Sequence, residues 1–396
     1  MRIASLRGLL VARGLRAFGD GFISLLLPAY LLALGLTPFE VGVIATGTLL
    51  GSAALTLLVG YHAYRFDFRA LLLAAAALMT ATGLAFALVA DFWPLLIVAV
   101  VGTLNPSSGD VSVFLPLEHA LLAKLAPDRM RTAWFARYSI IGSLLAAAGA
   151  LCAGTPQLIV RVTPLSMHAA LQAMFVLYAL LGVAAALVYR RLPGGPARTR
   201  EAPAAPLVEG RRVVYTLAAL FSIDALGGGF IVQSMLALWL FQRFALSTVT
   251  AGVIFFWTGV FSALSYLVAV KIANRIGLVY TMVFTHLPSN VLLILVAFAP
   301  DLATSVALLL LRSALSQMDV PTRSAFVMAI VPPVERPAAA SVTSVPRSLA
   351  SASSPLVAGY LLGVSTFGWP LVIAGALKIV YDVLLLATFR RHARKR

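Results

Sequence analysis

The chain has 396 residues and a formal net charge of +16; 61% of its residues are hydrophobic and only 11% are charged. A soluble globular domain is about half apolar and a quarter charged, so this composition excludes one and indicates an integral membrane protein. The excess of Lys and Arg does not indicate a nucleic-acid partner, because these residues gather in the loops on one side of the apolar segments, which reports orientation in a membrane.

Apolar segments follow one another along the chain, each close to the ~20 residues that a membrane-spanning helix needs. They begin near Leu9, Val41, Ala70, Pro94, Ala133, Met167, Val213, Ala251, Leu278, Thr304, Val342 and Trp369. Residues 192–212 are instead rich in Pro, Gly, Ala and charge, a linker composition. The sequence therefore predicts an all-α membrane protein with twelve transmembrane helices: six in residues 1–191, a linker at 192–212 and six in residues 213–396.

Positive charge is shared unevenly between the two sides of the predicted membrane. With the N-terminus inside, the loops of that side hold most of the Lys and Arg residues, whereas the opposite loops hold only Arg161 and Arg243. Cytoplasmic loops carry such an excess, so we expect both termini and the linker on the cytoplasmic side of an inner or plasma membrane. Basic residues at this face also attract anionic membrane lipid.

The first apolar segment carries three charges, Arg13, Arg16 and Asp20, whose spacing of three and four residues places them on one helix face. A charge near mid-membrane costs at least ~2.5–3.5 kcal/mol, so such residues face a bundle interior or a water-filled cavity. One interpretation is a structural pair of Arg16 with Asp20, with Arg13 reaching the interface. The other is a role in a transport pathway.

The fourth segment is interrupted by two prolines and two glycines, which weaken its backbone ladder. It carries Asn105 and the deeply placed Asp110, followed by Glu118 and His119, for which a position at the cytoplasmic interface is the alternative to a functional one. The fifth segment adds Arg137 and Tyr138, which are candidates for substrate contact.

The two halves of the chain echo each other at a nearly constant offset of 208 to 210 residues. The matched positions are Gly19–Phe22 with Gly227–Phe230, Val41–Val43 with Ala251–Val253, the turn at Arg65 with that at Arg275, and Asp110 with Asp319. Each match is short, but their common register predicts that the chain is a duplicated six-helix unit with pseudo-symmetric halves.

The second half also carries polar residues inside apolar segments. They are Asp224 and Gln233 in the seventh segment, Arg312, Gln317, Asp319 and Arg323 in the tenth, Arg347 in the eleventh, and Lys378 and Asp382 in the twelfth. A local ion pair is the alternative to a functional role for Asp319 with Arg323, which lie one turn apart. Lys378 and Asp382 have the same spacing, and we expect them to form a structural pair.

The twelve segments, the central linker and the basic turns after the second and eighth segments resemble the major facilitator superfamily. Its turn motif, Gly-x-x-x-Asp-Arg-x-Gly-Arg-Lys, is matched here at Gly60, Arg65 and Arg69, and in the second half at Arg275 and Gly277 with Asn274 in place of the acid. The resemblance implies two bundles around a site at mid-membrane and a gating role for these turns.

The resemblance also implies a secondary transporter that works by alternating access. The candidates for carrying a coupling proton are the acids Asp20, Asp110, Asp224 and Asp319. The candidates for contact with a small-molecule substrate are Arg16, Asn105, Arg137, Tyr138, Gln233, Arg312, Gln317 and Arg347. The number of arginines favours an organic anion or zwitterion, since guanidinium groups bind anionic groups well. Export is favoured by resemblance alone, and a proton-independent facilitator or an importer is the alternative.

The sequence contains no motif of an enzyme, such as a Ser/His/Asp elbow, a His-Glu-x-x-His segment or a phosphate loop. Its one cysteine, Cys152, offers neither an internal disulfide nor a metal cluster. We expect no cofactor and a monomer. A receptor or scaffold that transports nothing is the rival class, and charges paired within single helices would suit it.

Overall fold

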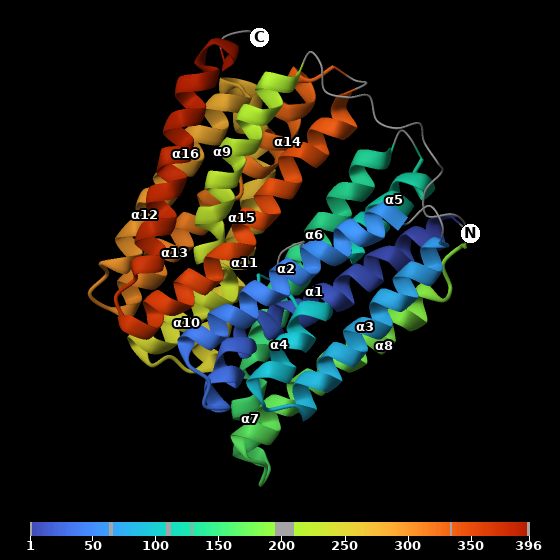
Figure 1. Cartoon of the computed structure of the whole chain (residues 1–396), viewed down its shortest axis with the longest axis vertical. Coiled ribbons are helices and arrows are strands. Elements are labelled where there is room, and N and C mark those ends of the chain that lie inside the picture. Colours follow the sequence, from blue (N-terminus) through green and yellow to red (C-terminus); the bar gives the residue numbers. More distant parts are fainter. Residues whose placement is uncertain are drawn as a thin grey trace.

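The computed structural model describes residues 2–62, 66–107, 112–127, 130–194, 210–332 and 335–393, and in these ranges the chain is helical with no β-strand (Figure 1). The first half contains α1 (Arg2–Ala33), α2 (Pro38–His62), α3 (Phe68–Leu88), α4 (Phe92–Val101), α5 (Phe114–Leu125), α6 (Arg131–Leu151), α7 (Thr155–Val162) and α8 (Met167–Tyr189). A short 3-10 turn, Cys152–Gly154, joins α6 to α7.

The second half contains α9 (Arg211–Phe230), α10 (Gln233–Phe244), α11 (Thr248–Ile276), α12 (Leu278–Ala297), α13 (Leu302–Ser316), α14 (Asp319–Ile330), α15 (Arg336–Val364) and α16 (Trp369–Ala393). Figure 1 shows the helices of each half side by side, with α1–α8 in one group and α9–α16 in the other. The exact division at residues 192–212 remains a prediction, because residues 195–209 lie outside the described part of the chain.

Nine helical segments in the described ranges are long and apolar enough to cross a membrane. The predicted fourth and tenth segments are each broken into two short helices, α4 with α5 and α13 with α14. The predicted eleventh segment is the long but more polar α15, which contains Arg347. The nine confirm a multi-pass α-helical membrane protein. That the fourth, tenth and eleventh segments also cross the membrane, for a total of twelve, remains a prediction.

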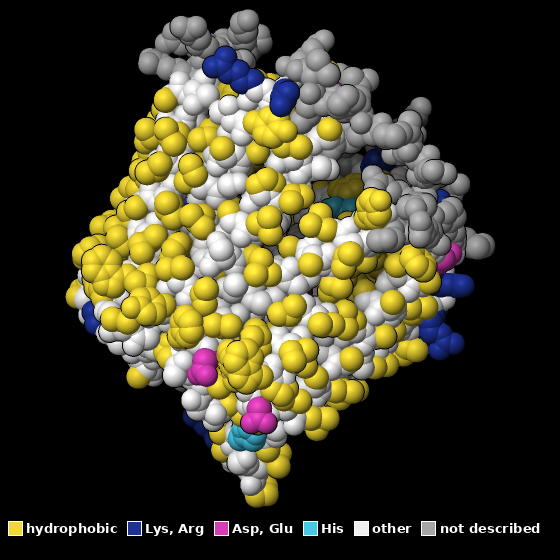
Figure 2. Space-filling view, viewed as in Figure 1, with side chains coloured by type: hydrophobic (Ala, Val, Ile, Leu, Met, Phe, Trp, Pro, Cys, Tyr) yellow, Lys and Arg dark blue, Asp and Glu magenta, His cyan; other side chains and the backbone are white. Residues whose placement is uncertain are grey.

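On the face shown in Figure 2, hydrophobic side chains cover most of the middle, and charged side chains lie mainly toward the edges of the view. Many large apolar side chains are exposed, among them Leu58, Leu88, Ile97, Leu180, Leu267 and Val364. In water so large an apolar surface would drive association, whereas in a bilayer it faces lipid. The exposed apolar band therefore agrees with a chain that spans the membrane.

The two halves meet where α2 packs against α15 and where α6 packs against α11. At the first contact Gly42 faces Gly359, and the Leu356 N–H donates to the Thr46 hydroxyl at 2.9 Å. At the second contact Gly252 lies against the backbone of Ala150. Small residues let helix backbones approach closely inside a membrane. All these contacts lie at the end of the molecule where α1 finishes, away from its first residues.

The turns that resemble the superfamily motif have clear structural roles. Asp67 caps the N-terminus of α3, since its carboxylate accepts the backbone N–H of Arg69 at 2.7 Å. Gly277 separates α11 from α12 with φ of +87°, a backbone conformation that favours glycine. Gly60 lies in the last turns of α2, and Asn274 and Arg275 lie in the last turn of α11. Arg65 lies outside the described residues.

The contact between α2 and α15 gives a stability prediction. In Gly359→Ala, the added Cβ would lie 2.5 Å from the Pro38 carbonyl oxygen and 2.9 Å from Gly42 Cα, both backbone atoms. Such overpacking costs about 1–3 kcal/mol, so thermal unfolding of the purified protein should occur at a lower temperature. Gly363→Ala, four residues on in the same helix, is the control, because nothing lies within 4 Å of its added Cβ. Equal melting temperatures for the two variants would contradict the tight contact.

Candidate functional site

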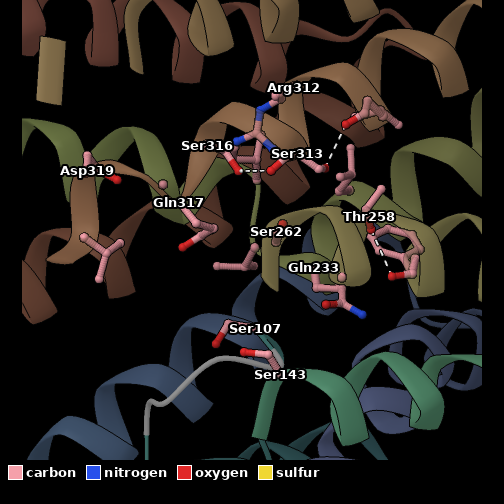
Figure 3. A pocket seen from close by; sticks show the side chains of 18 of the residues that line it. Ser107, Ser143, Gln233, Thr258, Ser262, Arg312, Ser313, Ser316, Gln317 and Asp319 are labelled. Atoms are coloured by element: carbon pink, nitrogen blue, oxygen red, sulfur yellow. Dashed lines mark hydrogen bonds between the residues drawn. The ribbon is translucent and has the colours of Figure 1, made fainter. Parts of the chain in front are cut away.

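A cavity of about 470 Å³ lies between the two halves. Its first-half side is formed by Ser107 and by small residues of α6, and its second-half side by polar residues of α9, α11, α13 and α14. Figure 3 shows Ser107 and Ser143 facing Arg312, Ser316 and Gln317 across this space. The stripe Ser143, Ala146, Ala147 and Ala150 lines the cavity because residues three and four apart share one helix face.

The charged side chains that line the cavity carry more positive than negative charge. The cations are Arg312, Arg323, Arg347 and Lys378, and the carboxylates are Asp224 and Asp319. All six come from the second half, so the cavity is electrostatically one-sided. A low-dielectric site with surplus positive charge attracts anions.

Two of these guanidinium groups have hydrogen-bond donors that no described residue uses. Arg312 Nε is buried without a partner among the described residues, and so are Nε and Nη1 of Arg323. Neither Arg312 nor Arg347 forms an ion pair with a carboxylate in the described part of the chain. An unsatisfied buried donor is costly, and a bound anion would satisfy it.

Two predicted amide residues also line the cavity. Gln233 begins α10, and Gln317 follows α13, where its Oε1 accepts a hydrogen bond from the Tyr266 hydroxyl at 2.9 Å. The sequence thus predicted four cavity residues among its substrate candidates: Gln233, Arg312, Gln317 and Arg347.

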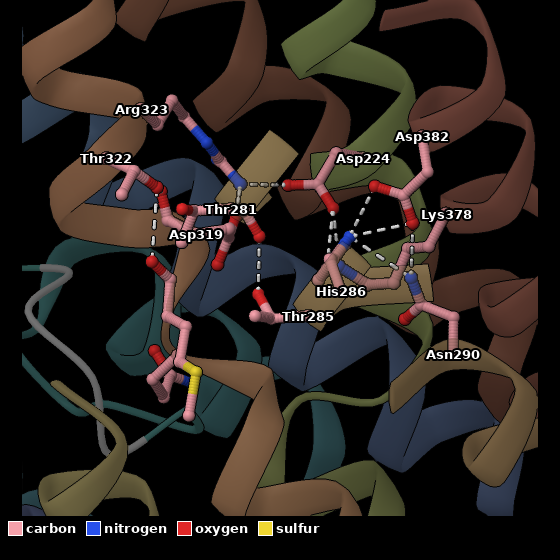
Figure 4. Close-up of polar contacts among 12 residues, drawn as sticks. Asp224, Thr281, Thr285, His286, Asn290, Asp319, Thr322, Arg323, Lys378 and Asp382 are labelled. Carbon is pink, nitrogen blue, oxygen red and sulfur yellow. Dashed lines mark hydrogen bonds and ion pairs between the residues drawn. The ribbon is translucent and has the colours of Figure 1, made fainter. Parts of the chain in front are cut away.

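Asp224, on α9, is the centre of a buried charged cluster (Figure 4). Its Oδ2 accepts from Arg323 Nη2 at 2.8 Å, and its Oδ1 accepts from Lys378 Nζ at 2.7 Å. Arg323 Nη2 also bonds Asp319, one turn earlier on α14. The cluster therefore joins α9, α14 and α16 through charge-assisted hydrogen bonds.

His286, on α12, lies between two carboxylates of this cluster. Its Nδ1 is 2.9 Å from Asp382 Oδ1, and its Nε2 is 3.7 Å from Asp224 Oδ1. Asn290, one turn on, donates to Asp382 Oδ2 at 3.0 Å. The sequence analysis missed His286; a His and an Asn one turn apart inside an apolar segment were the signal available.

The predicted structural pair of Lys378 with Asp382 needs correction. Lys378 instead donates to Asp224, and Asp382 bonds His286 and Asn290. Spacing of four residues places both side chains on one face of α16, but neighbouring helices offer each of them a partner nearer to its tip. The Asp319–Arg323 pair does form within one helix, as the local interpretation expected.

The first half holds a separate buried polar cluster around Glu118, which is fully buried on α5. Arg16 Nη2 bonds this carboxylate, and the hydroxyls of Tyr138 and Tyr189 donate to it. Arg16 Nε also donates to the Tyr189 hydroxyl at 3.0 Å. Glu118 is therefore a buried ion-pair partner of Arg16, which reaches this acid through the tip of its side chain, while the local pair of Arg16 with Asp20 stays a prediction.

Several other predicted site residues lie away from the cavity. Arg16, Tyr138 and Asp20 are buried in the first half and are not part of its lining. Arg137 is exposed on α6, and its guanidinium stacks on Trp134, 4.9 Å from the ring centre. It lies outside the lining of this cavity, and its predicted contact with substrate stays a prediction.

Asn105 acts on the cavity indirectly, because its Oδ1 accepts from the hydroxyl of Ser107 at 2.8 Å and so orients that lining residue. The predicted coupling acid Asp110 lies outside the described residues, so its equivalence to Asp319 stays a prediction. The role of Asp20 in coupling also stays a prediction.

The two clusters are related by the internal repeat with their charges exchanged. Arg16 on α1 and Asp224 on α9 lie 208 residues apart, within the register of the repeat. Glu118 and Arg323 lie 205 residues apart, outside that register, but each is the fifth residue of the short helix that follows the break in the fourth segment of its half, α5 and α14. Each half thus bonds its first helix to this short helix by a buried ion pair, in opposite polarity.

Comparison with known proteins shows which family the chain belongs to. Residues 9–315 match the Major Facilitator Superfamily. The chain belongs to the Major Facilitator Superfamily. An uncharacterized membrane protein of Saccharomyces cerevisiae, YJR124C, is 25% identical over 410 residues, covering 95% of this chain and 92% of its own length. The resemblance inferred from the turns and the repeat is confirmed.

Solved structures of superfamily transporters share the fold. A mutant of the nucleoside transporter NupG superposes with a TM-score of 0.78 at 14% identity, covering 97% of this chain and 99% of that one. The human organic anion transporter MFSD10 gives a TM-score of 0.66 at 18% identity, again covering 97% and 99%. The superfamily member described here therefore has a transporter fold. In its described residues no group of three or more His, Cys, Asp or Glu side chains is placed to hold a metal ion.

The cluster around Glu118 predicts a structural role. Glu118→Gln should remove the carboxylate that Arg16 bonds and lower the free energy of unfolding by about 3–5 kcal/mol, the usual cost of removing one partner of a buried pair. Thermal unfolding in detergent measures this loss. Asp91→Asn, at the exposed position before α4 where the side chain makes no capping hydrogen bond, is the control and should unfold like the wild type. A Glu118→Gln protein as stable as this control would contradict a structural role for the cluster.

Proposed function

We propose that this superfamily member is a secondary transporter that moves a small organic anion or zwitterion across the membrane by alternating access. The observation that carries the proposal is the surplus of positive charge around the cavity between the halves. Two lining arginines, Arg312 and Arg323, also hold buried donors that are unused among the described residues. Guanidinium groups bind carboxylates and phosphates in two-point geometry, so an anionic group is the substrate feature that this lining fits best.

The packing between the halves supports alternating access. Gly42 meets Gly359, and Ala150 meets Gly252, at the end of the bundle away from the first residues of α1. These contacts between small residues can separate without breaking the ion pairs of the two described clusters, because each cluster lies within a single half. Rigid halves that rock about a central site are the mechanism expected for such inverted and parallel repeats.

Coupling to a proton gradient belongs to the same proposal. Of the four acids that the sequence analysis selected, Asp224 and Asp319 line the cavity, so the substrate and a titratable cluster share one space. Export, which rests on resemblance, and import are both compatible with this cavity, and flux in each direction separates them. A proton-independent facilitator would show the same flux with and without a pH gradient.

The rival interpretation, a receptor or scaffold that transports nothing, depends on charges paired within single helices. The described ion pairs of Arg16 with Glu118, and of Asp224 with Arg323 and Lys378, join different helices. The pair of Arg323 with Asp319, by contrast, lies within one helix. This distribution favours the transporter, as does the likeness in fold to solved transporters of nucleosides and organic anions.

The experiment that tests the proposal is flux into vesicles that contain the purified protein. Uptake of radiolabelled benzoate, succinate, citrate and glutamate would be compared with uptake of the cation tetraphenylphosphonium, with protein-free vesicles as the blank. We expect saturable flux of at least one anion and none of the cation. Flux of the cation alone, or no flux of any solute from a panel extended to nucleosides and peptides, would overturn the proposal.

Arg312→Gln gives the residue-level prediction. Removing this guanidinium should raise the KM for the transported anion by about tenfold or more, since a charge-assisted hydrogen bond is worth about 1.5–3 kcal/mol. The matched control is Arg137→Gln, which removes an exposed arginine outside the cavity and should leave KM unchanged. An equal effect of both substitutions would show that total charge, not the cavity lining, sets the affinity for the anion.

Orientation in the membrane gives a further prediction. Both termini and the linker should be cytoplasmic, because the loops of that side hold most of the Lys and Arg residues. In a protein with Cys152 replaced by Ala, an impermeant thiol reagent added to intact cells should label Thr37→Cys and Ala303→Cys but not Thr199→Cys. Labelling of the linker position from outside would contradict this topology.

A further inference from the structure

We propose that His286 and Asp382 together hold the exchangeable proton of this transporter, a site that deepens the proposed function and rests on it. The two side chains lie on neighbouring helices, α12 and α16, at the edge of the cavity between the halves. His286 lines the cavity, whereas Asp382 is fully buried behind it. The imidazole therefore stands between the carboxylate and the space that a substrate and water would occupy.

The charge balance of the cluster carries the inference. Three carboxylates, Asp224, Asp319 and Asp382, share the buried space, and two cations bond the first two of them: Arg323 bonds Asp224 and Asp319, and Lys378 bonds Asp224. When the His286 imidazole is neutral, these three carboxylates outnumber the two bonded cations by one. A proton on His286 makes the charges of this group equal. Histidine is the side chain whose charge changes between about pH 5 and 8, so it suits this role.

The partners of each acid show which one is free to accept a proton. Asp224 accepts hydrogen bonds from two cations, Arg323 and Lys378, and Asp319 is held by Arg323. Among the described residues, Asp382 accepts no hydrogen bond from Arg323 or Lys378; its partners are His286 and the neutral amide of Asn290. A carboxylate bonded to fixed cations stays ionised, whereas one that faces an imidazole and an amide can exchange its proton with the imidazole. The coupling acid is therefore Asp382 rather than Asp224 or Asp319.

The geometry allows a two-step relay in which every proton is accounted for. In the neutral imidazole Nδ1–H donates to Asp382, 2.9 Å away, and Nε2 carries a lone pair on the side of Asp224. A proton from cavity water binds Nε2, and the Nδ1 proton then passes to the Asp382 carboxylate. The result is a neutral imidazole protonated on Nε2 and a neutral Asp382, and the reverse sequence releases the proton to the cavity.

The surroundings of His286 are charged on several sides. The titratable and charged groups nearest to it on other helices are Asp224 on α9, Asp319 and Arg323 on α14, and Lys378, Tyr381 and Asp382 on α16. Tyr266 of α11, Arg312 of α13 and Arg347 of α15 line the same cavity, and Arg347 lies within electrostatic reach of Asp224 and Asp319. Taking up a proton makes this wall more positive by one charge, so the proton and an anionic substrate should bind cooperatively.

Infrared difference spectroscopy tests the site without any substrate. Reconstituted wild-type protein titrated from pH 8 to pH 5 should gain the band of a protonated, buried carboxylic acid. Asp382→Asn should lack this band. In His286→Gln the band should appear over a different pH range from the wild type, because the imidazole no longer delivers the proton. His168→Gln, which removes a histidine that stacks on Tyr30 in the first half, is the matched control and should keep the wild-type titration. A band unchanged in both Asp382→Asn and His286→Gln would overturn the proposal.

A flux experiment links the site to transport, with succinate as the probe. In the wild type the KM for succinate should rise about tenfold from pH 6 to pH 8, and His286→Gln should reduce this change to less than twofold while succinate exchange continues. Asp382→Asn provides a second variant if the first does not fold. Succinate flux whose pH dependence survives both substitutions would overturn the proton site alone. Absence of anion flux in the wild type would instead overturn the proposed function, leaving the infrared result to judge the site.

Discussion

A charge inside a membrane must find a partner, and this requirement shapes both halves of the protein. In the first half Arg16 of α1 bonds Glu118 of α5; in the second half Asp224 of α9 bonds Arg323 of α14. These bonds join the first helix of each half to the short helix that follows the break in its fourth segment. Each pair secures an interrupted segment whose own backbone ladder is incomplete. The duplicated fold thus keeps the position of the bond and exchanges the signs of its charges.

The exchange of signs accompanies a division of roles between the halves. Around Glu118 the hydroxyls of Tyr138 and Tyr189 complete the hydrogen bonding of the carboxylate, and the cluster lies apart from the cavity. The cluster around Asp224 instead borders the cavity and includes a histidine, a lysine and unused guanidinium donors. The first half therefore supplies a scaffold with a smooth wall of serine and alanine, and the second half supplies the charges that can bind or titrate.

Contacts between the halves differ in kind from the contacts within them. Glycine and alanine backbones meet between α2 and α15 and between α6 and α11, with little side chain between them. Such contacts gain dispersion energy and small-residue packing but do not involve the buried ion pairs. The strong interactions hold each half together, and the weaker ones hold the halves to each other. That order of strengths suits two rigid bodies that move about a shared cavity.

The sequence by itself determined the membrane class, the duplicated helical architecture and the family, because hydropathy and the repeat register are properties of the linear chain. It also identified Gln233, Arg312, Gln317 and Arg347 as polar residues in apolar segments, and the cavity brings them together. Only the tertiary structure decided the partners. Spacing of four residues pairs Lys378 with Asp382, yet α9 and α12 offer closer groups in Asp224 and His286. Long side chains reach across to neighbouring helices, and no pattern along one helix records which neighbour lies there.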